Sequence, residues 1–218
     1  MRSRPGLFAR ACLICWPAVQ AGFAMSEAPP EVPAHPAIAV FMDFDGKPLD
    51  LSLEEMKKEA EGLLKSSGIA LSWRMLSENH GTDASPGLVV VKFRGNCRVE
   101  SWPRPGEEEL PQGTHTLGFT RVSGGHVLPF SEIECNQIRK SLTYLARDST
   151  PQERQKAFGL AMGRVVAHEL YHMLTRTTAH AEEGLARATQ SLRDLVASPA
   201  IVFRESDARA IGQSLDAR

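Results

Sequence analysis

Five segments of the chain show the apolar patterns typical of β-strands. They alternate apolar and polar positions, or run apolar for five or more residues, and they are rich in β-branched and aromatic side chains. These segments are residues 37–44, 69–75, 87–93, 116–122 and 126–133. Gly124 and Gly125 lie between the last two segments. A glycine pair at such a position is typical of a tight turn, so we expect these two segments to form a hairpin or a pair of neighbouring strands.

Three further segments have the apolar period of an α-helix: residues 53–66, 136–147 and 151–174. Ser52 and Glu55 are spaced as a capping box and predict the start of the first helix. Thr150 is suited to cap the third helix, with Pro151 at its first position and Glu153 at its third. Residues after the third helix show no clear period and predict an irregular tail.

The order of these elements predicts an α+β fold: a single domain with a twisted mixed sheet and helices packed on it. We expect one strand within residues 116–133 to form an edge of the sheet above the third helix. Because an edge strand can accept an extended peptide as an additional strand, this edge is the expected substrate site.

The third helix contains the sequence His168-Glu169-Leu170-Tyr171-His172, an HExxH motif. Residues four apart on a helix lie about 40° apart around its axis, so His168 and His172 share one face and can bind one metal ion. Glu169 can then act on a water molecule at that ion, as in zinc peptidases. Tyr171 is expected to point away and pack. The alternative is a core helix whose histidines hydrogen-bond to backbone groups.

Catalytic zinc ions commonly have three protein ligands. His180 follows His172 by eight positions, after a stretch poor in helix-forming residues. The helix can end in that stretch and the chain can turn back, so His180 is the preferred third ligand. Glu182 and Glu183 remain alternatives, and Glu205 is a more distant one.

The segment 165–174, together with the later His180, resembles the zinc-binding helix of zincin-type metallopeptidases and is similar to metzincins and archaemetzincins. It is most similar to exported bacterial proteins that carry HELYH or HELGH. The resemblance implies that His168, His172 and His180 bind Zn²⁺ and that Glu169 is the general base. The chain departs from metzincins in two respects. Its loop to the third histidine is two residues longer, and Ala186 stands where a methionine turn is expected.

The N-terminus combines three arginines with a short apolar run that ends in small residues, which predicts a signal peptide at residues 1–24. A proline-rich linker at 25–36 and a domain at 37–218 follow. We therefore expect a secreted or periplasmic bacterial protein, in which Cys97 and Cys135 form a disulfide. The formal net charge of −1 gives no indication of nucleic-acid binding. No later segment is long and apolar enough to span a membrane.

These observations predict an exported, monomeric zinc-dependent peptidase that acts on a peptide or protein substrate. The alternative is a non-catalytic zincin-fold binding protein with a structural or vestigial metal site.

Overall fold

A computed structural model describes residues 37–78, 87–99, 116–143, 149–191 and 193–216. They belong to one structural unit, His35–Arg218. The predicted signal peptide and linker lie outside the described residues.

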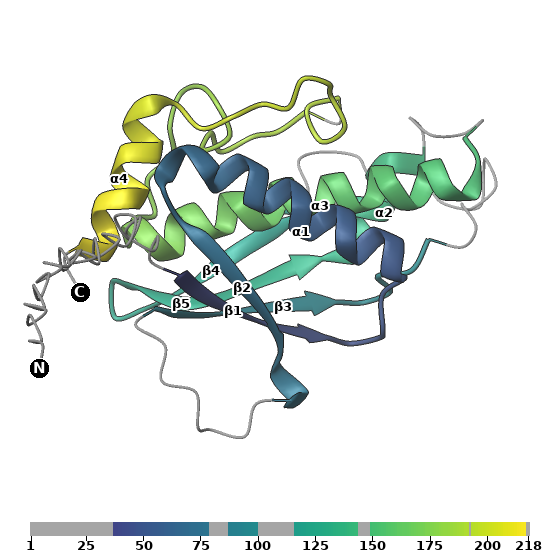
Figure 1. The fold of residues 1–218 in the computed structure, drawn as a ribbon, viewed down its shortest axis with the longest axis horizontal. Coiled ribbons are helices and arrows are strands. Elements are labelled where there is room, and N and C mark those ends of the chain that lie inside the picture. Colours follow the sequence, from purple (N-terminus) through teal and green to yellow (C-terminus); the bar gives the residue numbers. More distant parts are fainter. Residues whose placement is uncertain (1–36, 79–86, 100–115, 144–148, 192, 217–218) are drawn as a thin grey trace, which may run out of the picture. The chain divides into compact units, whose positions relative to one another are not determined.

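A five-stranded mixed sheet forms the centre of the fold (Figure 1). Its strands are β1 (Ala37–Phe44), β2 (Ala70–Met75), β3 (Leu88–Arg94), β4 (Gly118–Ser123) and β5 (His126–Glu134). The strand order is β2-β1-β3-β5-β4. β4 is antiparallel to β5, and the other neighbouring strands are parallel. All five predicted strands are confirmed, as are the α+β class and an edge strand within residues 116–133.

The four α-helices are α1 (Asp50–Leu64), α2 (Cys135–Thr143), α3 (Pro151–Thr175) and α4 (Glu205–Asp216). α1 and α3 lie side by side on one side of the sheet (Figure 1). Alternate strand residues face them, because successive side chains of a strand point to opposite faces. The core formed in this way includes Ile38, Val40, Met42, Val89, Val91, Phe93, Ile133, Met56, Leu64, Phe158, Met162 and Leu170. None of the described helices is both long and apolar enough to cross a bilayer.

The contact between α1 and α3 determines how α1 begins. A Cβ atom at Gly159 would lie 2.6 Å from the carbonyl oxygen of Ser52, so the two helices meet at their backbones. Ser52 is fully buried there, and its hydroxyl donates to the carbonyl of Gln155 at 3.0 Å. The helix starts at Asp50 after an extended Leu49 and has no side-chain cap. The predicted capping box at Ser52 is therefore wrong, because a tertiary hydrogen bond takes the hydroxyl.

The start of α3 follows the local sequence. Thr150 accepts the backbone N–H of Glu153 at 3.2 Å, and the Glu153 carboxylate accepts the backbone N–H of Thr150 at 2.7 Å. This reciprocal capping box and Pro151 at the first turn confirm the predicted start. The helix ends at Thr175, one residue beyond the predicted end.

The prediction of an irregular tail is wrong for the last described residues, which form α4. Ala208 and Ile211 are buried on one face of this helix. Gly212 lies against the chain that follows α1, where a Cβ atom would be 2.8 Å from the carbonyl oxygen of Ser67. So few apolar positions give a weak helical pattern, and the helix depends on this packing.

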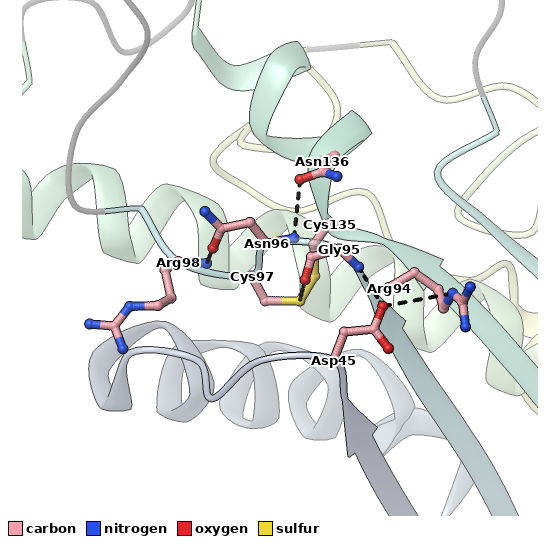
Figure 2. Close-up of a disulfide and its surroundings, with 8 residues drawn as sticks. All are labelled: Asp45, Arg94, Gly95, Asn96, Cys97, Arg98, Cys135 and Asn136. Atoms are coloured by element: carbon pink, nitrogen blue, oxygen red, sulfur yellow. Dashed lines mark hydrogen bonds and ion pairs between the residues drawn. A yellow bond between two sulfur atoms is a disulfide. The ribbon is translucent and has the colours of Figure 1, made fainter.

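A disulfide between Cys97 and Cys135 ties the end of β3 to the start of α2, as predicted (Figure 2). Gly95 has a φ of 76°, which favours glycine, and its N–H donates to the Asp45 carboxylate at 2.9 Å. The side-chain oxygen of Asn136 accepts the backbone N–H of Asn96 at 3.1 Å (Figure 2). Two hydrogen bonds, to Asp45 and to Asn136, thus fix the turn before Cys97. A disulfide is typical of proteins from oxidising compartments.

Replacing both cysteines by alanine is expected to lower the free energy of unfolding by about 4 kcal/mol, because the bond closes a loop of about 39 residues in the unfolded chain. Urea denaturation of the variant and of the oxidised wild-type protein measures the difference. A loss below about 1 kcal/mol would contradict a stabilising role for this bond.

Candidate metal centre

The C-terminal half of α3 is buried, and it presents the motif residues toward two neighbouring segments. Glu169 and His172 are only 3% and 6% exposed, and His168 is partly buried. Tyr171 is also buried and packs against Phe203, with ring centroids 5.9 Å apart, so its predicted packing role is confirmed. Polar groups in such surroundings require partners, because burying them without hydrogen bonds is unfavourable.

The end of α3 supplies the first of these partners. Arg176 adopts a left-handed conformation with a φ of 53°, and its N–H donates to the carbonyl of His172. This conformation turns the chain back over the last helical turn. As a result the carbonyl of Thr177 accepts a hydrogen bond from Nδ1 of His172 at 2.8 Å.

The returning chain brings His180 to the two motif histidines. Nε2 of His172 lies 3.1 Å from Nε2 of His168 and 3.2 Å from Nε2 of His180. These three residues form a group whose ligand atoms all lie within 4.8 Å of one another. Glu182 and Glu183 are exposed, and no carboxylate belongs to the group among the described residues.

The hydrogen bonds of the rings determine which nitrogens are free. Nδ1 of His168 donates to the carbonyl of Leu185 at 2.8 Å, as Nδ1 of His172 does to Thr177. Because a neutral imidazole carries one proton, both Nε2 atoms are then acceptors that face each other at 3.1 Å. A cation bound by both lone pairs removes this repulsion. Tetrahedral zinc–nitrogen bonds of about 2.1 Å would place ligand atoms about 3.4 Å apart, close to the spacing here.

Burial keeps the motif histidines neutral. It lowers the pKa of His168 from 6.5 to about 4, although the Leu185 carbonyl opposes the shift. Burial also lowers the pKa of His172, against the effect of the Thr177 carbonyl. A neutral ring keeps its lone pair at neutral pH, which is the form that binds metals.

Glu169 lies next to His168 in the sequence but contacts the edge strand of the sheet. The hydroxyl of Thr120 in β4 donates to Oε2 of Glu169 at 2.7 Å. Burial raises the pKa of Glu169 to about 7, and the hydrogen bond from Thr120 partly opposes this shift. A carboxylic acid with a pKa near neutrality can take up and release a proton under ordinary conditions, as a general base requires.

The carbonyl of Leu185 is itself held in place. The N–H of Leu185 donates to the carbonyl of Val202 at 3.0 Å, and the side chain of Gln190 donates to the Leu185 carbonyl at 2.9 Å. Gly184 has a φ of 76°, and a Cβ atom there would lie 2.9 Å from the Val202 oxygen. The glycine therefore permits the close approach that orients the His168 ring. Ala186, where a methionine turn was expected, is fully buried.

A buried arginine fixes the segment that follows Leu185. Arg164 of α3 is 4% exposed, and its Nε donates to Glu59 of α1 at 2.7 Å. Its two terminal nitrogens donate to the carbonyls of Asp194 and Ala197. One side chain thereby joins two helices and the segment beyond Gln190.

Several contributors to this site were not identified from the sequence. The carbonyls of Thr177 and Leu185 leave no signal in residue type, because every residue has a backbone carbonyl. Thr120 lies in a correctly predicted strand, but nothing in that strand distinguished it from its neighbours.

No protein-family profile matches the chain, and no curated protein shows significant similarity to it. The interpretation of the site therefore rests on the geometry of its residues.

Proposed function

We propose that this protein is an exported zinc-dependent peptidase. The observation that carries the proposal is the convergence of three imidazole Nε2 atoms, two of them with their Nδ1 protons committed to carbonyls. Zn²⁺ held by His168, His172 and His180 would polarise the scissile carbonyl and acidify a water molecule.

Glu169 is the residue proposed to move protons. Its carboxylate takes a proton from the attacking water and gives it to the amine that leaves. The burial of Glu169 supports this role, because a raised pKa makes the carboxylate a stronger base than an exposed one. The hydroxyl of Thr120 donates a hydrogen bond to Oε2 of Glu169. The other carboxylate oxygen, Oε1, does not take part in this hydrogen bond.

The composition of the histidine group supports a catalytic site over a structural one. Structural zinc sites are closed by four protein ligands, whereas catalytic sites keep one position open. Among the described residues the group contains three histidines and no fourth ligand. His180 is exposed, so one side of the group faces solvent.

The edge strand supports an extended peptide as substrate. β4 pairs only with β5 among the described strands, so its outer edge offers backbone groups for an additional strand. The same strand contacts Glu169 through Thr120. A peptide added along β4 would therefore run close to the general base. The disulfide supports export to an oxidising compartment.

Metal analysis and proteolysis together test the proposal. We expect the purified protein to contain about one zinc ion per chain. It should cleave an unfolded protein substrate, lose this activity with a chelator or a hydroxamate, and regain it when zinc is restored. Absence of bound metal at neutral pH would exclude the site. Zinc binding without cleavage of any peptide would favour the non-catalytic alternative.

A further inference from the structure

The edge strand donates a hydrogen bond to one oxygen of the Glu169 carboxylate and passes close to the other. The hydroxyl of Thr120 donates to Oε2 at 2.7 Å and lies 3.3 Å from the Glu169 backbone oxygen. On the other side, a Cβ atom at Gly118 would lie 3.0 Å from Oε1 and 2.8 Å from a methyl group of Val165. Gly118 therefore leaves space that any larger residue would fill.

We infer that Thr120 is a positioning residue for Glu169, and that β4 thereby sets the direction in which the carboxylate points. This inference rests on the proposed function. A glutamate has three side-chain torsions, and burial alone does not select among their rotamers. The hydroxyl of Thr120 supplies a directional contact to one oxygen, and Gly118 leaves room for the other.

Threonine is suited to this role by its stiffness. A β-branched side chain has restricted rotation about χ1, so the position of its hydroxyl follows the strand backbone. β4 is held in turn by β5, where Thr120 pairs with Ser131. The position of Oε2 is thus set by the central sheet, which is separate from the helix that carries Glu169.

Ser131 provides a matched control on the neighbouring strand. It lies opposite Thr120, so both side chains point to the same face of the sheet. Its hydroxyl is fully buried and has no hydrogen-bond partner among the residues that the structure describes. Ser131→Ala removes a buried hydroxyl close to Thr120 without removing a contact to Glu169, and an unsatisfied buried group contributes no stability.

The kinetic test compares Thr120→Val, Thr120→Ser and Ser131→Ala in the zinc-loaded protein. Thr120→Val keeps the shape of the side chain and should lower kcat by about 10- to 100-fold with KM changed less than about 2-fold, as expected when a supporting hydrogen bond is lost. Thr120→Ser retains the hydroxyl and should stay within about 5-fold of wild type. Ser131→Ala should match wild type. A Thr120→Val protein with wild-type kcat overturns the inference.

A second measurement is independent of catalysis and of metal. With metal removed by a chelator, the Thr120→Val substitution should lower the melting temperature when it is introduced into the wild-type protein. It should not lower the melting temperature of the Glu169→Ala protein, because the contact between Thr120 and the Glu169 side chain is already absent there. Equal shifts in both backgrounds would exclude the contact and with it the inference. If the wild-type protein binds zinc and cleaves nothing, the proposed function fails. If the melting temperatures still show that Thr120 and Glu169 are coupled, their contact contributes to stability alone. The positioning role is then excluded together with the proposed function.

Discussion

Glu169→Gln is expected to lower kcat/KM for peptide cleavage by about 10²- to 10⁴-fold, because the variant has no group that accepts the proton of the attacking water. Zinc content should not change, since the three histidines are untouched. Glutamine retains an oxygen that can accept the Thr120 hydroxyl, so the position of the side chain is preserved. Cleavage assays on proteins with equal measured zinc content isolate the chemical role. An active glutamine variant would contradict the assignment of Glu169 as general base.

The pH dependence of stability gives a second readout of the same variant. The pKa of Glu169 is raised from 4.5 to about 7 in the metal-free fold, so the native state holds its proton where the unfolded state has lost it. This destabilises the native state by an amount that is zero below pH 4.5 and complete above about pH 7. The free energy of unfolding of metal-free Glu169→Gln should therefore exceed that of the metal-free wild type by up to about 3 kcal/mol in mildly alkaline buffer. In acid the two free energies should be equal. Denaturant unfolding at several pH values checks this. A pH-independent difference would mean that Glu169 titrates normally.

Replacing His172, the central residue of the histidine group, by alanine is expected to abolish the stabilisation of the fold by zinc. His172 is the histidine whose Nε2 lies within 3.2 Å of both other rings, so His172→Ala removes the shared contact. In wild type, free zinc at 1,000 times its dissociation constant should add about 4 kcal/mol to the free energy of unfolding. In the variant this increment should vanish. The increment is the informative quantity, because alanine also leaves the carbonyl of Thr177 without its partner and lowers stability in the absence of metal.

His126 supplies the control for this experiment. It is exposed at the start of β5 and does not belong to the histidine group. His126→Ala should keep the full zinc-dependent shift in melting temperature and the full zinc content. If His172→Ala retained that shift, the zinc site would lie elsewhere in the chain.

The strands and the motif helix could be predicted because their signals are local. Alternation of apolar residues specifies a half-buried strand wherever the sheet forms, and Thr150 and Glu153 satisfy each other's backbone groups within one turn. Ser52 has the same local signal as Thr150, but α3 approaches closely enough for its hydroxyl to bond to Gln155. α4 escaped prediction because it buries few apolar residues, among them Ala208 and Ile211, and its stability comes from their packing.

The sequence by itself determined that His168 and His172 share one face of a helix beside Glu169, because their spacing needs only helical geometry to place both rings there. Only the tertiary structure decided that His180, and neither Glu182 nor Glu183, joins that pair. The reason is that a loop's path depends on where it is held, here by the left-handed turn at Arg176. The same holds for Thr120, which meets Glu169 across 49 positions of sequence. Hydrogen bonds between distant segments form only once the sheet and the helix have packed, so no local pattern encodes them.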